Sequence, residues 1–135
     1  MSVFVLDSNI LSFYLRQDPQ IIQKVQDALL VGNEVLIGPI AYYEVKRGLL
    51  AVKAEKRLIE FSALCQTLGV GQMDNSILDA AADIYCELRE KKQTIEDADI
   101  FSAAFCRCHG FTLVTHNVKH FDAISGLCYC DWKEG

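Results

Sequence analysis

Asp7 and Asn117 each come just after an apolar run that has the composition of a buried strand. The run VFVL at 3–6 precedes Asp7, and FTLVT at 111–115 ends two residues before Asn117. Ligands of α/β proteins bind beyond the carboxyl ends of the strands, so both side chains are candidates for catalysis or metal binding. The alternative roles are local: an Asp often caps a helix, and an Asn often bonds the backbone of a turn.

Two further acids lie in segments with helical spacing. Glu44 stands between Tyr43 and Val45, and Asp99 is followed directly by Ile100. A carboxylate beside apolar neighbours needs a partner or a cation. The alternatives are an exposed helix position for Glu44, and for Asp99 an acid in the first turn of a helix, where the helix dipole favours negative charge.

Asp97 is a secondary candidate because it lies close to Asp99. Residues two apart on a helix differ by about 200° in direction, so the two acids cannot face one site. We expect Asp99 to face the site and Asp97 to face solvent. Thr115 is also a candidate, since its hydroxyl can bond a carboxylate or a phosphate.

Together these side chains indicate a divalent-cation site. Carboxylate and amide oxygens are the ligands that Mg²⁺ and Mn²⁺ prefer. The chain has 13 basic and 18 acidic residues, a net charge of −5, which excludes binding of nucleic acid through a general basic surface. A bound cation would supply the local positive field that a phosphate substrate needs.

The elements that must position these residues alternate between strands and helices. We expect strands at 3–6, 35–37, 111–115 and 127–130, with a weaker one at 68–70. We expect helices at 9–15 (capped by Ser8), 19–31 (begun by Asp18), 39–48, 51–67 (ended by Gly69), 75–88 (capped by Asp74) and 96–108 (ended by Gly110). This alternation predicts an α/β fold with a mostly parallel sheet. The length of 135 residues predicts a single domain, 1–135.

Composition also bears on location. No run approaches the ~20 apolar residues of a membrane span, and no basic segment precedes the first apolar run, so we expect no membrane segment and a cytoplasmic protein. The six cysteines are then expected to be reduced, mostly as small buried residues, with zinc binding as the less favoured alternative.

Four segments, in this order, resemble the ordered motifs of PIN-domain nucleases, in particular the VapC toxins of toxin–antitoxin modules. They are VLDSN at 5–9, YEVKRG at 43–48, DIFSAA at 99–104 and LVTHN at 113–117. The resemblance implies a three-layer α/β/α sandwich and a Mg²⁺- or Mn²⁺-dependent endoribonuclease that cleaves tRNA or rRNA. It also implies a homodimer and a VapB-like antitoxin as partners.

By motif position, Asp7, Glu44 and Asp99 match the metal-binding acids of that family. Asn117 matches a fourth catalytic position that is often Asp, and as a neutral amide it adds no charge. The implied reaction is in-line hydrolysis that leaves a 5′-phosphate and a 3′-hydroxyl. Lys46 and Arg47 are candidates for contact with RNA or antitoxin, or are simply solvated.

Two other functions remain as alternatives: another metal-dependent phosphodiesterase or DNA nuclease, and a non-catalytic PIN-like binding module. For the antitoxin, the expected mode is a basic, apolar segment that docks across the first two helices with its cation near Asp7 and Asp99. The apolar residues expected to receive it are Ile10, Leu11, Phe13, Tyr14, Ile21 and Ile22; the alternative is that they fill the core or the dimer contact.

Overall fold

The computed structural model describes residues 1–133. Its strands are β1 (Val3–Leu6), β2 (Glu34–Ile37), β3 (Thr112–Val114) and β4 (Cys128–Cys130). Its α-helices are α1 (Ser8–Leu15), α2 (Pro19–Leu30), α3 (Pro39–Ala51), α4 (Glu55–Leu68), α5 (Asn75–Glu90) and α6 (Asp97–His109), and a short 3₁₀ helix, η1, spans Val118–His120.

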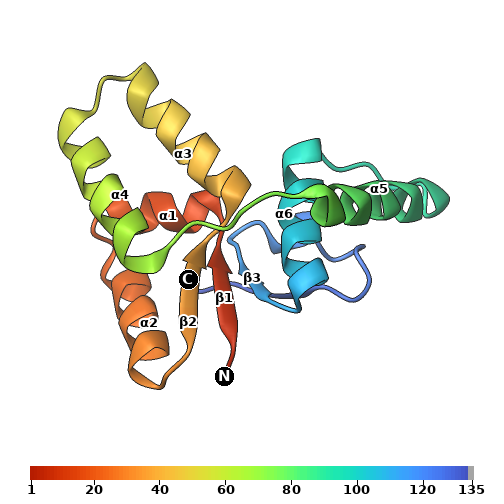
Figure 1. The fold of residues 1–135 in the computed structure, drawn as a ribbon, viewed down its shortest axis with the longest axis horizontal. Helices are drawn as coiled ribbons and strands as arrows, with labels where there is room; N and C mark the ends of the chain where they lie inside the picture. The colour runs from red at the N-terminus through yellow and green to blue at the C-terminus, as the bar shows by residue number, and fades with distance from the viewer. Residues whose placement is uncertain (134–135) are drawn as a thin grey trace.

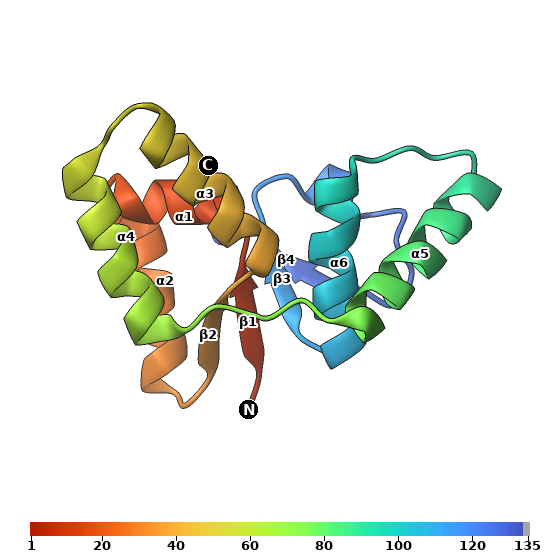
Figure 2. The ribbon, with the colours of Figure 1, turned by 45° about the horizontal axis from the view of Figure 1, so that its top comes forward.

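The four strands form one sheet in the order β2-β1-β3-β4, and every neighbouring pair is parallel. Helices α1 to α4 lie to one side of the strands, and α5 and α6 lie to the other (Figure 1). The turned view shows the same division (Figure 2). The predicted α/β/α sandwich with a parallel sheet is confirmed.

Alternation along the strands explains the two layers of core. Leu6 and Val114 pack into a cluster with α1 to α4, whereas Val5 and Leu113 pack into a second cluster with α5 and α6. Successive residues of a strand point to opposite faces, so each short apolar strand supplies both clusters.

The helix ends follow their predicted signals. Asp18 caps α2 and Asp74 caps α5 through side-chain oxygens that accept backbone N–H groups. Gly69 and Gly110 end α4 and α6 with positive φ values of 88° and 71°, which a residue without a Cβ adopts readily.

Three local expectations need correction. The boundary between the helices predicted at 39–48 and 51–67 is misplaced: α3 continues to Ala51, and the chain turns through Lys53 at φ 54° before α4 begins at Glu55. Asp7, not Ser8, caps α1. The weak strand at 68–70 is reduced to one bridge between Val70 and Ile37.

The early helices are also more buried than a docking surface requires. Ile10, Leu11 and Ile21 are fully buried in the core, so they are not available to an antitoxin. Phe13, Tyr14 and Ile22 are half-buried. Within residues 1–133, none of the helices has both the length and the apolar character needed to cross a membrane.

Candidate active site

Asp7 lies at the carboxyl end of β1, in the middle of the sheet. Its backbone N–H donates to the carbonyl of Val114 at 2.9 Å, so the residue continues the pairing of β1 with β3. The carboxylate is almost completely buried, with 6% of the residue exposed. The position therefore holds a carboxylate in a fixed place where polar side chains are rare.

Both oxygens of Asp7 accept hydrogen bonds. Oδ1 accepts the backbone N–H of Ser8 at 2.9 Å, the capping contact of α1, and Oδ2 accepts the hydroxyl of Thr115 at 2.8 Å. Thr115 is fully buried and follows β3 directly. Asp7 thus has the local capping role considered as its alternative, and it also faces the neighbouring strand end.

Thr115 is held in turn by a small polar network. Its hydroxyl oxygen accepts the side-chain amide of Asn9 at 3.5 Å and the backbone N–H of Asn117 at 3.2 Å. Asn9 also accepts the backbone N–H of His116 at 3.1 Å. The first turn of α1 and the loop after β3 are therefore joined at this point, and Asn9 fixes the hydroxyl that bonds Asp7.

Burial and negative neighbours raise the pKa of Asp7 above its ordinary value. Desolvation is the main cause, the hydrogen bonds from Thr115 and Ser8 oppose it, and the charges of Asp99 and Glu44 raise the pKa further. Both of these acids therefore act electrostatically on Asp7. Asp7 follows β1, Glu44 lies in α3 and Asp99 lies in α6, and helices α3 and α6 are in contact. Three predicted carboxylates from separate parts of the sequence are thus close enough to affect one another's charge.

Asp99 lies in the first turn of α6 and is bonded to His120. One nitrogen of the His120 ring, Nδ1, is 2.9 Å from Oδ2 of Asp99, whose side chain is 21% exposed. The other oxygen of Asp99 has no hydrogen-bond partner among residues 1–133. The neighbouring Asp97 is exposed, as the helical spacing predicts.

A shallow hollow opens beside Asp99. It has a volume of about 330 Å³ and is lined by Thr94, Ile95, Glu96, Asp99 and His120. Glu44 is half-buried, and its carboxylate makes no hydrogen bond or ion pair within the described part of the chain. The site therefore has open space on the α6 side and two carboxylates with free oxygens.

Asn117 lies in a different environment from the three acids. It is exposed and precedes η1. Its only bond to the polar network of the site is the one that its backbone N–H donates to the Thr115 hydroxyl. Lys46 donates to the Tyr42 hydroxyl at 3.0 Å, and Arg47 lies over the Tyr43 ring on the surface of α3.

Sequence reasoning missed two members of the site, Asn9 and His120. Asn9 is two residues after Asp7, so its polarity in the first turn of α1 was a usable signal. His120 gave no such signal, because it lies 21 positions after Asp99 in the sequence. In the structure His120 is bonded to Asp99, and the nearby His116 is bonded to Asp131.

The donor set fits a hard divalent cation by its chemistry. Carboxylate oxygens of Asp7, Glu44 and Asp99 would carry the charge, and burial and the neighbouring acids raise the pKa of Asp7, so a cation at this place would favour its ionised form. In the side-chain positions of residues 1–133, no three His, Cys, Asp or Glu residues are already arranged around one ion. The carboxylates of Asp7 and Asp99 are bonded to Thr115 and His120 instead.

Known proteins share this fold and this chain length. Ribonuclease VapC1 of Haemophilus influenzae is 24% identical over 133 residues, 98% of this chain and 99% of the relative. The VapC2 ribonuclease of Rickettsia felis is also 24% identical and has the same coverage of both chains. The structure of VapBC2 from Rickettsia felis bound to a promoter DNA fragment matches with a TM-score of 0.88 at 22% identity, over 97% of this chain and 99% of that chain.

The model of the PIN domain matches residues 4–127, a range that contains all four predicted site residues. It also contains β2, β3 and all of β1 but Val3, and the carboxyl ends of these three strands surround Asp7. The arrangement of a buried Asp at the central strand end, with acids on two flanking helices, is thus found within the matched region, and the chain belongs to the PIN-domain family.

Proposed function

We propose that this protein is a divalent-metal-dependent endoribonuclease toxin that cleaves structured RNA of the tRNA or rRNA class. The observation that supports it is the buried Asp7 at the carboxyl end of the central strand, in the electrostatic field of Asp99 and Glu44. The relatives named as VapC ribonucleases, matched over their full length, support ribonuclease activity.

Asp7, Glu44 and Asp99 would hold Mg²⁺ or Mn²⁺. When bound, the cation lowers the pKa of water beside it and stabilises negative charge on the scissile phosphate. Two hydrogen bonds hold the Asp7 carboxylate in place: the buried Thr115 hydroxyl donates to one oxygen, and the backbone N–H of Ser8 donates to the other. Asn117 would contact substrate from the rim, because its amide is exposed beside this network.

His120 would orient Asp99 for this role. Its ring bonds only Oδ2, so Oδ1 stays available to a cation. Carboxylate ligands in metal sites commonly have such a supporting hydrogen bond. Removal of the partner typically lowers metal affinity or activity by roughly 10- to 100-fold.

The test is an RNA cleavage assay with matched variants on α6. Purified protein is incubated with total tRNA, with rRNA and with DNA, in Mg²⁺ and in EDTA. Asp99→Asn should abolish RNA cleavage, whereas Asp97→Asn, the same change on an exposed neighbour, should retain it. If Asp99→Asn cleaves RNA like the wild type, the site is wrong; if only DNA is cut, the DNA-nuclease alternative replaces the proposal.

We also propose a VapB-like antitoxin as partner. The support is that structures with this fold are toxin–antitoxin complexes, including one from Salmonella typhimurium bound to DNA, with a TM-score of 0.88 at 23% identity over 98% of this chain and all of that one. A cation inserted near Asp7 and Asp99 would offset their repulsion. Inhibition by the antitoxin's C-terminal peptide should be lost when its Arg and Lys residues are replaced; unchanged inhibition would contradict cation insertion.

A homodimer acting in the cytoplasm completes the proposal. Tyr43 and Leu50 lie two turns apart on α3 and are 58% and 55% exposed, so one side of the helix offers two apolar side chains that a second copy of the chain would cover. Sedimentation of the wild type should give twice the monomer mass, and Tyr43→Lys/Leu50→Lys should give the monomer mass. A monomeric wild type would refute the dimer.

A further inference from the structure

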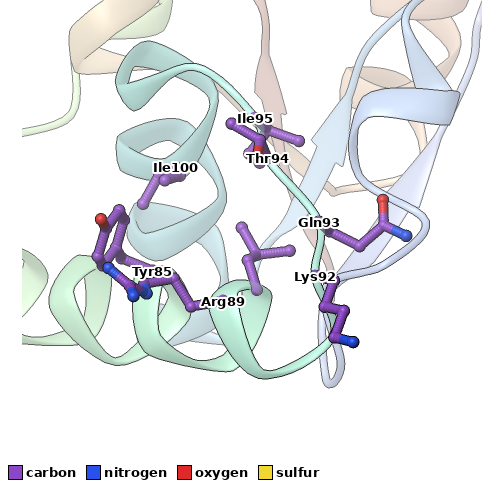
Figure 3. Close-up of a pocket in the computed structure, with 8 residues that line it drawn as sticks. Tyr85, Arg89, Lys92, Gln93, Thr94, Ile95 and Ile100 are labelled. Atoms are coloured by element: carbon purple, nitrogen blue, oxygen red, sulfur yellow. The ribbon is translucent and has the colours of Figure 1, made fainter.

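A second pocket lies between the end of α5, the start of α6 and the loop that joins them. Its volume is about 330 Å³, within the range of small-ligand pockets. Tyr85 and Arg89 lie on the α5 side, Ile100 lies on α6, and Lys92 and Gln93 lie on the loop at the other side (Figure 3); Leu88 also lines the pocket. The acids proposed for catalysis do not line it.

This pocket adjoins the hollow beside Asp99. Thr94 and Ile95 line both, so the two spaces share one wall, formed by the loop before α6. A polymer held in the second pocket therefore needs to pass over only this short segment to reach Asp99. The geometry suits a chain molecule whose neighbouring units occupy neighbouring pockets.

The opening carries positive charge in a protein of net charge −5. Arg89 and Lys92 are exposed, and neither forms an ion pair or side-chain hydrogen bond with any residue in 1–133. Arg107, in contrast, is bonded through both terminal nitrogens to Glu87. Figure 3 shows the Lys92 ammonium directed outward from the loop, as expected for a group that meets a solvated anion at the rim.

The wall of the pocket offers an aromatic ring beside one of these cations. Tyr85 is 49% exposed, and Arg89 lies one helical turn later on α5, so the two side chains lie on the same side of the helix, and both line the pocket. An exposed ring beside an unpaired cation is the combination that binds a base and its phosphate in single-stranded nucleic acid. Stacking on the ring tolerates any base.

We propose that this pocket holds one unpaired base of the RNA substrate next to the cleavage point, stacked on Tyr85, with the adjoining phosphates at Arg89 and Lys92. This inference rests on the proposed ribonuclease function. It adds a subsite that selects single-stranded or looped RNA, because a base in a duplex is not free to enter.

Lys92 permits a variant that separates binding from stability. Its φ is 57°, a left-handed conformation in which glycine has no steric cost. Lys92→Gly removes the charge and also the steric strain of a Cβ at this positive φ. A loss of binding in this variant is therefore not explained by a loss of folding stability. Tyr85→Phe is the companion for the ring, because it keeps stacking and removes the hydroxyl.

The experiment measures fluorescence anisotropy of a labelled, mixed-sequence RNA of about 12 nucleotides, a length that spans such a site. EDTA prevents cleavage, and salt concentration is varied. Tyr85→Ala should weaken binding roughly 5- to 150-fold, and Tyr85→Phe should bind like the wild type. Arg89→Gln/Lys92→Gly should make the fall of log affinity with log salt concentration shallower by about 1.4, because each of the two lost phosphate contacts contributes about 0.7 to that slope.

The matched control is Lys56→Gln/Arg57→Gln, which removes the same charge from a pocket on the α4 side. It should leave affinity and salt slope unchanged. Equal losses in this control, or wild-type binding by Tyr85→Ala in a protein that cleaves RNA, would overturn the subsite and leave the proposed function standing. A wild-type protein that neither binds nor cleaves RNA would overturn both.

Discussion

Replacing Asp7 with Asn tests the centre of the site, because the change removes one charge and keeps the shape. The amide oxygen can still accept the N–H of Ser8, and the amide nitrogen can donate to the Thr115 hydroxyl in place of the long 3.5 Å contact from Asn9. Burial raises the pKa of Asp7, so without metal the ionised carboxylate opposes folding at neutral pH. Metal-free Asp7→Asn should therefore be at least as stable as the wild type at pH 7.

The pH dependence has a definite sign. A group whose pKa is higher in the folded than in the unfolded protein binds protons more tightly when folded, so acidification through the folded pKa stabilises the wild type. The variant lacks this contribution, because Asn does not titrate. In EDTA, the stability advantage of Asp7→Asn should shrink as the pH falls from 7 through the raised pKa of Asp7.

The effect of Mg²⁺ has a calculable size. A ligand present at 100 times its Kd stabilises the folded state by about 2.7 kcal/mol. For a chain of 135 residues, 1 kcal/mol shifts Tm by about 3.5 °C, so saturating Mg²⁺ should raise the wild-type Tm by about 10 °C. Asp7→Asn should show almost none of this shift and lose at least about 100-fold in kcat/KM.

The assay is a thermal melt of both proteins in EDTA and in a Mg²⁺ series, beside RNA cleavage. Asp7→Asn should show an unusual pair of results. Its stability in EDTA should equal or exceed that of the wild type, and Mg²⁺ should no longer raise its Tm. A variant that keeps the full Mg²⁺ shift would show that the cation binds elsewhere. A variant that melts well below the wild type in EDTA would show that the charge of Asp7 supports the fold.

Three further perturbations test the surroundings of the site. Thr115→Val leaves the buried Asp7 oxygen without its donor and should cost about 1–3 kcal/mol in the free energy of unfolding by denaturant, whereas Thr115→Ser should recover most of it. Gly71→Ala would place a Cβ 2.4 Å from the Phe105 ring and should cost about 1–3 kcal/mol; Gly71→Ala/Phe105→Leu should be less destabilised, and a wild-type Tm in the single variant would contradict the clash. Titration of the denatured, unreduced protein should find six thiols, of which the buried Cys106, whose pKa is raised by burial, reacts only after unfolding; fewer than six would reveal a disulfide.

The sequence was most informative where one local signal decides the structure. Short apolar runs fix β1 and β3, and Asp18 and Asp74 begin helices as expected because a side-chain oxygen caps the first turn. The break between α3 and α4 was expected three residues too early, because the turn passes through Lys53, a residue with no turn preference, at a positive φ.

Candidate site residues could likewise be predicted only where their sequence neighbours gave a local signal. Asp7 and Asp99 stand out because a charge follows or precedes apolar residues. The bond between Asp99 and His120 joins residues that are 21 apart in sequence, and only the packing of the loop after β3 against α6 brings them together. The three apolar residues of α1 and α2 that proved to be core could not be separated from surface ones by spacing, since both helices are short.

The pairing of β1 with β3 also determines when the site of a newly made chain can form. The hydrogen bond between Thr115 and Asp7 spans 108 positions, and β1 has β3 as its neighbour on one side. During translation, Asp7, Glu44 and Asp99 emerge before β3 and the Thr115 that follows it. A nascent chain therefore carries its three acids on an unfinished sheet until β3 has been made and can pair with β1.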